Sequence, residues 1–320
     1  MKITIEQWDG EYESACQMFD VVELCLPLQS KMDRAHAVSF LEKMQQPFPN
    51  STLVAKKHGQ VVATAMLYAG PNDRVACMVG AVHPSLRKQG VGTELLSILV
   101  GHLERYPQRR QLQANAFQSN SDGIRFLQKR GFAEVDRLHW LSRPTDLAFA
   151  DWLLDKEKAL ERSALRVVVA TEFETLRDDW DVAWWKAKTA MDADIPSATP
   201  FAEIPFEEWK GYLSPPFLNR HHALILLDDI EPVGFLFLGE VDRGTVNINY
   251  TGIAREYRRR GLSVVLKVKA FRHALALGAN TITTQNHDAN PMLGLNRTLG
   301  FSELDVDVIF SKDLPLATSP

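Results

Sequence analysis

The sequence has few cysteines, no excess of basic residues and no long apolar run, and each absence excludes a class of protein. Only three of its 320 residues are cysteine, all in the first half and without metal-ligand spacing, which argues against a disulfide framework and a metal site. The formal net charge of −4, from 36 basic and 40 acidic side chains, argues against general nucleic-acid binding. No apolar run reaches membrane-spanning length, and residues 1–6 form no signal core. We therefore expect a cytoplasmic monomer or homodimer with no metal and with neither a nucleic acid nor a membrane as partner.

The most informative feature that is present is a long internal repeat. Residues 87–92 read Arg-Lys-Gln-Gly-Val-Gly, and 171 positions later residues 258–263 read Arg-Arg-Arg-Gly-Leu-Ser. Each segment is followed by a stretch that begins with Asn and ends with Gly-Phe, at 120–132 and at 290–301. Two motifs in the same order at nearly the same spacing indicate two whole domains, which also agrees with the chain length.

Both halves show the same order of predicted elements. Each has a β-hairpin, a strand, the repeated loop, a helix and a last strand, at 136–141 and 305–310, and the first half has a short helix at 121–129 before its last strand. The hairpins are at 52–68 and 223–238, the strands before the loops at 75–82 and 246–253, and the helices after them at 93–103 and 264–277. This order predicts an α/β fold in which each half is a mixed, mostly antiparallel sheet flanked by helices. We expect an N-terminal domain at 1–145, a linker helix at 146–164 and a C-terminal domain at 165–320.

The repeated loop has the composition of an anion-binding site. Its glycines let the backbone approach a ligand closely, and the free amides and dipole of the following helix, with basic side chains, suit a pyrophosphate. The loop is not a Walker P-loop, because no Gly-Lys-Ser/Thr follows, and Leu95 stands where a dinucleotide fingerprint has its third glycine. A single copy would be explained equally well as a surface turn, but two copies, each after a strand, favour a ligand site.

Both halves resemble the GNAT N-acetyltransferase superfamily. That family's coenzyme A loop reads (Q/R)-x-x-G-x-(G/A), and its following segment commonly ends N-x-x-A-x-x-(F/L)-Y-x-x-x-G-F. The matching residues of this segment are Asn120, Gly123, Phe126, Gly131 and Phe132 in the first half, and Asn286, Asn290, Leu293, Leu295, Gly300 and Phe301 in the second. The resemblance covers essentially the whole chain and implies two tandem GNAT-like domains, in an arrangement similar to mycothiol synthase.

The resemblance implies that acetyl-CoA is the acetyl donor and that a small-molecule primary amine is the acceptor. The implied pyrophosphate-binding residues are Arg87, Lys88, Gln89, Gly90, Val91 and Gly92 in the first half, and Arg258, Arg259, Arg260, Gly261, Leu262 and Ser263 in the second. The pantetheine arm would pair with the backbone around Val82 or Ile253. It would also contact Asn120 in the first half, and Asn286 or Asn290 in the second. A backbone N–H beside Ile253 would face the developing oxyanion.

The sequence departs from the family pattern at the acid and the base. The family's strand glutamate falls on Ala76 and Asn247, and its tyrosine, which protonates the leaving thiolate, falls on Leu127 and Asn296. An alkyl ammonium must lose a proton before it attacks a thioester. That proton would pass to bound water or to an unrecognised residue. Alternatively, the acceptor amine has a low pKa, or one or both halves have no catalytic activity. We name Asn247, Ile253 and Asn296 as the candidate catalytic positions.

The second half has more polar residues where an acceptor would bind. Asp192 and Asp194 lie in its long segment before the hairpin and are the candidate acceptor-binding residues, while we assign the tryptophans around them to core packing. Asn247, Asn249 and Thr251 alternate on one strand face, which can hold a water chain. We therefore expect transfer in the second half and weak or structural CoA binding in the first. The alternatives are a CoA-binding sensor or scaffold without activity, and an acyltransferase for a longer acyl-CoA.

Overall fold

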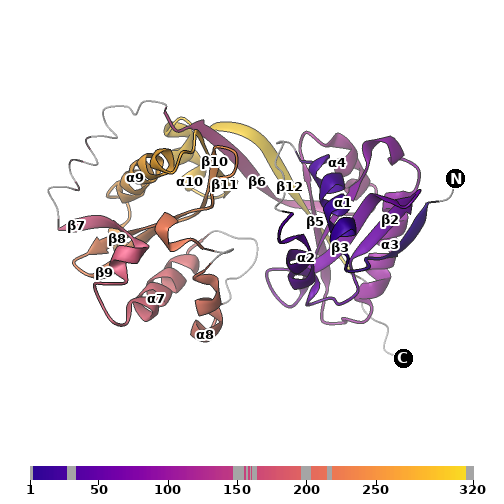
Figure 1. Ribbon diagram of the computed structural model, residues 1–320, viewed down its shortest axis with the longest axis horizontal. Helices are drawn as coiled ribbons and strands as arrows, with labels where there is room; N and C mark the ends of the chain where they lie inside the picture. Colours follow the sequence, from indigo (N-terminus) through magenta and orange to yellow (C-terminus); the bar gives the residue numbers. More distant parts are fainter. Residues whose placement is uncertain are drawn as a thin grey trace. The chain divides into compact units, whose positions relative to one another are not determined.

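The chain folds into two compact units (Figure 1). The structure, a computed structural model, describes residues 3–26, 34–146, 155, 158, 160, 164–195, 203–214 and 218–314. Unit 1 contains the described residues up to Leu138 and those from Asp305 on, and unit 2 contains those between. The predicted linker helix at 146–164 lies for the most part outside the described residues.

Unit 1 is a mixed sheet with a helical layer on each face. Its strands, in the order in which they pair, are β1 (Thr4–Gln7), β2 (Leu53–Lys57), β3 (Gln60–Ala69), β4 (Val75–Val82), β5 (Gln111–Phe117) and β12 (Ser302–Asp313). Only β4 and β5 pair in parallel, and the other neighbours are antiparallel. The helices are α1 (Tyr12–Glu23), α2 (Ala37–Gln45), α3 (Val91–Leu103) and α4 (Ser121–Gln128), with the 3-10 turn η1 (Pro84–Leu86). Strand β6 (Ala133–Pro144) leaves unit 1 after Leu138.

The two-residue period of the strands assigns one sheet face of unit 1 to each helical layer. Ala76 and Met78 of β4 pack in one core with the leucines of α3, whose helical spacing is the predicted one. Ala81 of β4 packs in the other core, together with Phe19 of α1. Neighbouring residues of β4 therefore face different helical layers.

Unit 2 repeats this plan. Its strands pair in the order β7 (Leu165–Val169), β8 (Ala223–Asp228), β9 (Glu231–Leu238), β10 (Thr245–Ile253) and β11 (Thr281–His287), and only β10 and β11 are parallel. Its helices are α6 (Ala170–Phe173), α7 (Trp180–Asp192), α8 (Phe206–Trp209), α9 (Leu262–Ala276) and α10 (Met292–Thr298), with 3-10 turns η2 (Lys210–Tyr212), η3 (Arg220–His222) and η4 (Arg255–Tyr257). Trp184 is fully buried and stacks on Phe235, so the assignment of this tryptophan to the core is confirmed. None of the described helices is long and apolar enough to cross a membrane.

The last strand lies in a different place from the one that the repeat predicts. The repeat assigns residues 305–310 to the second domain, but β12 pairs antiparallel with β5 of unit 1, from Asp307 opposite Phe117 to Asp313 opposite Gln111 (Figure 1). Strand pairing is made by backbone groups that every residue carries, so the sequence alone does not state which open sheet edge a strand joins. As a result, residues distant in sequence complete the sheet of unit 1.

Candidate functional site

The two repeated loops have the same backbone conformation. Each follows a 3-10 turn, η1 or η4, and ends at the N-terminus of a long helix, α3 or α9. Lys88 and Arg259 have φ values of 63° and 62°, and the helix N-cap residues Gly90 and Gly261 also have positive φ. Positive φ is uncommon for residues other than glycine. A turn of this kind brings backbone N–H groups together on an anion, where the helix dipole adds to the attraction.

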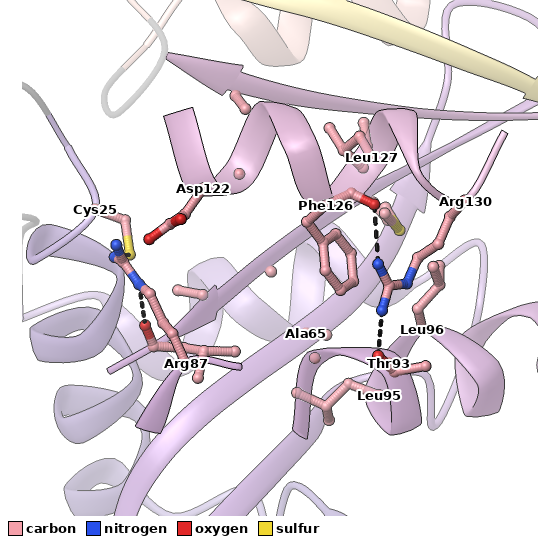
Figure 2. Close-up of a pocket in the computed structure, with 18 of the residues that line it drawn as sticks. Cys25, Ala65, Arg87, Thr93, Leu95, Leu96, Asp122, Phe126, Leu127 and Arg130 are labelled. Atoms are coloured by element: carbon pink, nitrogen blue, oxygen red, sulfur yellow. Dashed lines mark hydrogen bonds between the residues drawn. The ribbon is translucent and has the colours of Figure 1, made fainter. Parts of the chain in front are cut away.

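The first arginine of each loop ties the loop to its own strand. Arg87 donates from Nε to the carbonyl oxygen of Val82 at 3.2 Å (Figure 2), and Arg258 donates to that of Ile253 at 2.9 Å. Nη2 of Arg87 also lies 3.4 Å from Sγ of Cys25. Each side chain thus fixes the geometry of the loop while its charge stays beside the loop amides.

A cavity of about 380 Å³ adjoins the loop of unit 1 (Figure 2). Its walls come from β4, β5, α3 and α4, with apolar side chains along its length and basic ones at the loop. The apolar lining includes Met78, Leu95, Leu96, Phe126 and Leu127. This size and lining are those of a small-molecule or cofactor pocket.

The strands beside the cavity separate. β4 and β5 pair only at residues 75–77 with 111–113, although β4 continues to Val82 and β5 to Phe117. Beyond that point the facing backbone groups of the two strands do not pair with each other, so an extended, amide-containing arm can pair with them as an added strand. In unit 2, β10 and β11 pair only at 245–248 with 281–284 and then separate in the same way.

Arg130, which follows α4, ties this segment to the start of α3 at the cavity through Thr93. Arg130 donates to the carbonyl of Phe126 at 3.0 Å and to Oγ1 of Thr93, and its guanidinium lies 3.7 Å from the centre of the Phe126 ring (Figure 2). A Cβ at Gly92 would lie 3.2 Å from this ring. A side chain at Gly92 would therefore require the Phe126 ring to shift slightly, so glycine gives the closest packing of the loop on α4.

Asn120 is the N-cap of α4, and Asn290 forms a turn just before α10, whose N-cap is Pro291. Asn120 lines the cavity, and its Oδ1 accepts a hydrogen bond from the backbone N–H of Gly123 at 3.1 Å. Oδ1 of Asn290 accepts from the backbone N–H of Met292 at 2.9 Å. Such bonds satisfy backbone donors at the helix start, so both residues have a structural task besides any contact with a ligand.

Unit 2 carries polar residues where unit 1 has apolar cavity walls. Leu96, Ala116 and Leu127 of unit 1 match Lys267, Asn286 and Asn296 in the repeat, and all three are buried. Nδ2 of Asn296 donates to Oδ1 of Asn286 at 2.5 Å. Asn296, the candidate at the position of the family's thiolate-protonating tyrosine, is 0% exposed, and its bond to Asn286 joins α10 to β11.

Lys267 was not identified from the sequence. It is 1% exposed on α9, and burial lowers the pKa of its ammonium to about 7. The sequence does contain a signal for this site, because the lysine lies on the buried face of the predicted helix, at the position that matches Leu96 in the repeat.

The candidate acceptor residues Asp192 and Asp194 are engaged in ion pairs. Asp194 lies 2.7 Å from Nη2 of Arg258 and also pairs with Arg255, and the hydrogen bonds from these arginines hold its pKa below the usual value. Asp192 pairs with Lys188 at 2.5 Å. The structure thus places Asp194 against the second loop, where its charge opposes the binding of an anion.

The predicted polar face of β10 is present at Asn247 and Asn249, whereas Thr251 pairs with Leu236 and lies on the face of Ile248. Nδ2 of Asn247 donates to Asn249 at 2.6 Å, and Oγ1 of Thr283 donates to Asn247 at 3.0 Å. The pairing of β10 with β9 shifts register between Ile248 and Tyr250, an irregularity that re-aims side chains. Ile253 is buried at the end of the same strand. No three His, Cys, Asp or Glu side chains in the described part of the chain lie together as a metal site.

The repeated loops, the separated strands and the cavity define an enzyme that transfers an acyl group from a thioester of a long, pyrophosphate-bearing carrier. A family model described as the acetyltransferase (GNAT) family matches residues 17–132 and again 180–301. The chain therefore belongs to the GNAT family, as a tandem acyltransferase with two domains.

Solved structures with the same fold cover the whole chain. A GCN5-related N-acetyltransferase from Sphaerobacter thermophilus is 14% identical, with a TM-score of 0.73 over 99% of this chain and 98% of its own. A tandem GNAT protein from the clavulanic acid biosynthesis pathway is 17% identical, with a TM-score of 0.71 over 100% of both chains. At these identities the likeness shows the fold alone. The chain has no match among curated proteins.

Proposed function

We propose that the protein transfers an acetyl group from acetyl-CoA to a primary amine of a small molecule, and that acetyl-CoA binds in the cavity of unit 1. The cavity beside the first loop is the observation that carries this proposal. The pyrophosphate lies on the amides of residues 87–92, and the pantetheine arm enters between the separated ends of β4 and β5. Asn120 lines this path. The thioester then lies near Val82, where a backbone N–H of β4 stabilises the oxyanion.

The sequence favours the second half as the seat of transfer, and the polar face with Asn247 supports that alternative. The ion pairs of Asp194 weigh against it, because they neutralise Arg255 and Arg258 beside the loop amides. An incoming pyrophosphate must compete with this carboxylate. Lys88 of unit 1 also has a carboxylate partner, Asp122 at 3.4 Å, but the lysine side chain is 77% exposed and the contact is longer than the pair of Asp194 with Arg258 at 2.7 Å. We therefore place acetyl-CoA binding and transfer in unit 1.

A CoA-binding protein without activity is the second candidate. In unit 1 the positions of the family's glutamate and tyrosine are Ala76 and Leu127, which are both buried and apolar. If neither residue is replaced by another acid or base, the unit binds the donor without transferring the group.

The test combines binding with turnover. Calorimetry with CoA is carried out on Gly90→Val and Gly261→Val, each of which places a branched side chain at a loop position with positive φ. Gly101→Val is the control, since this glycine lies in α3, the helix that follows the first loop, and an added Cβ there meets nothing within 4 Å. Thiol release from acetyl-CoA is then measured with amino sugars, polyamines, amino acids and antibiotics. We expect Gly90→Val to abolish turnover and CoA binding by unit 1; normal turnover in Gly90→Val with loss in Gly261→Val would place transfer in unit 2.

A further inference from the structure

Four polar side chains gather on the sheet face of unit 1 opposite α3 and α4. They are Tyr68 of β3, Cys77 of β4, Asn115 of β5 and Asp307 of β12. The residues that alternate with them pack in the core with α3 and α4, so these four point to the other face. Tyr68 pairs in register with Cys77, and Asp307 accepts a hydrogen bond from Nδ2 of Asn115.

Asp307 is a buried carboxylate with an unused oxygen. It is 6% exposed, and while Oδ2 accepts the bond from Asn115, Oδ1 has no hydrogen-bond partner in the described part of the chain. Burial raises the pKa of this carboxyl to about 6, the charge of Asp305 adds to the rise, and the bond from Asn115 opposes it. A buried acceptor without a partner destabilises the fold, so a role other than stability is indicated.

Of the four residues, Asn115 lines the cavity, and its hydrogen bond connects Asp307 to this position. Val79 and Asn115 line the cavity, and both belong to the sheet face of Cys77 and Asp307. Met78 and Ala114 line it from the other face. The cavity therefore passes through the opening between β4 and β5, so that a thioester bound from one face can be attacked by an amine that enters from the other.

The other titratable groups around Asp307 do not supply a better base. Asp305, on the same strand, is already the acceptor for both the hydroxyl and the backbone N–H of Ser119. Burial raises the pKa of Cys77 to about 11, and burial also raises that of Tyr68, so both stay protonated at neutral pH. Arg109, which interacts with Cys77, is a permanent cation.

We propose that Asp307 is the general base of unit 1, in the role of the family's glutamate that Ala76 replaces, and that Asn115 holds its carboxylate toward the acceptor amine. This inference rests on the proposed function of unit 1. Asp307 takes one proton from the acceptor ammonium, and the neutral amine attacks the thioester carbon. The C–N bond forms, the C–S bond breaks, and the second proton of the nitrogen passes to the thiolate, which leaves as CoA thiol. Asp307 then returns its proton to solvent.

The test uses the full-length protein with acetyl-CoA and two probe amines. Ethanolamine is mostly protonated at neutral pH and needs a base, whereas hydroxylamine is mostly neutral and does not. For Asp307→Asn we expect kcat/KM to fall about 100-fold with ethanolamine and less than about 10-fold with hydroxylamine, with CoA binding unchanged. In the parent, activity with ethanolamine rises with pH through a pKa near 6, because the base must be deprotonated; Asp307→Asn loses this rise and Asp307→Glu keeps it.

Asp305→Asn is the matched control, because it removes a buried carboxylate from the same strand. It should retain turnover, with the pH rise moved to lower pH, since the charge of Asp305 raises the pKa of Asp307. The proposal is overturned if Asp307→Asn keeps the rate and pH profile of the parent. It is also overturned if kcat/KM falls equally with both amines, as a structural defect would cause. A parent that binds CoA but releases no thiol with these probes or with any amine of the panel above contradicts the proposed function itself.

Discussion

Arg258 donates from Nε to the carbonyl oxygen of Ile253 at 2.9 Å, and thereby anchors the second loop to the end of β10. Arg87 makes the matching bond to Val82 of β4 at 3.2 Å. The side chain at this position holds the loop in the shape that presents its amides, and this task requires a donor of sufficient length.

The first prediction concerns this donor in unit 1. Arg87→Ala should weaken CoA binding about tenfold or more, because the loop loses a hydrogen bond from a charged group, worth about 1.5–3 kcal/mol. Arg87→Gln retains a donor and should lose less. Calorimetric titration with CoA measures both. Equal losses of CoA affinity in Arg87→Ala and Arg87→Gln would show that binding depends on the positive charge of Arg87 and not on its hydrogen bond to Val82.

The second prediction concerns Asp194 and the loop of unit 2. Asp194→Asn frees Arg255 and Arg258 from a carboxylate, and we expect CoA binding by unit 2 to strengthen several-fold, since both cations then become available to the pyrophosphate. The measurement is calorimetry in the Gly90→Val background, in which unit 1 is blocked. Asp192→Asn, which leaves these arginines paired, is the control. Unchanged affinity in Asp194→Asn would rule out competition by this carboxylate.

The third prediction concerns the buried Lys267. Because its folded-state pKa is lowered to about 7, the unfolded chain binds more protons between about pH 7 and 10.5, so parental stability rises with pH in that window. Lys267→Met should remove this rise and increase the free energy of unfolding at pH 7 by about 2–4 kcal/mol. Denaturant unfolding at several pH values measures it, with Lys269→Met on the same helix as control. A parental stability that stays flat from pH 7 to 10 would disprove the assignment.

The parts of the fold that depend on local rules could be predicted from the sequence. Gly90 and Gly261 mark positions of positive φ, and the leucines of α3 mark its buried face. The placement of β12 could not be predicted, because sheet edges pair through backbone groups common to all residues. The bond between Asn115 and Asp307 joins residues 192 positions apart, so it follows only once that pairing is known. The same holds for Asp194, whose partners lie 61 or more positions away.

The last prediction separates function from stability at Asp307. Its pKa is raised to about 6 in the folded state, above the ordinary aspartate value near 3.9, so folded protein binds more protons between these values. Parental stability should therefore fall as pH rises from about 4 through 6, and the carboxylate should destabilise the fold at pH 7. Asp307→Asn removes the buried charge and should raise the free energy of unfolding at pH 7 by about 1–3 kcal/mol, while it lowers activity. Asp305→Asn should instead lower stability, because Asp305 accepts two hydrogen bonds from Ser119. Urea unfolding at pH 5 and pH 7 measures both variants. If Asp307→Asn is less stable than the parent, the carboxylate of Asp307 stabilises the fold. A base that is retained for catalysis at the expense of stability should instead leave a more stable protein when it is removed.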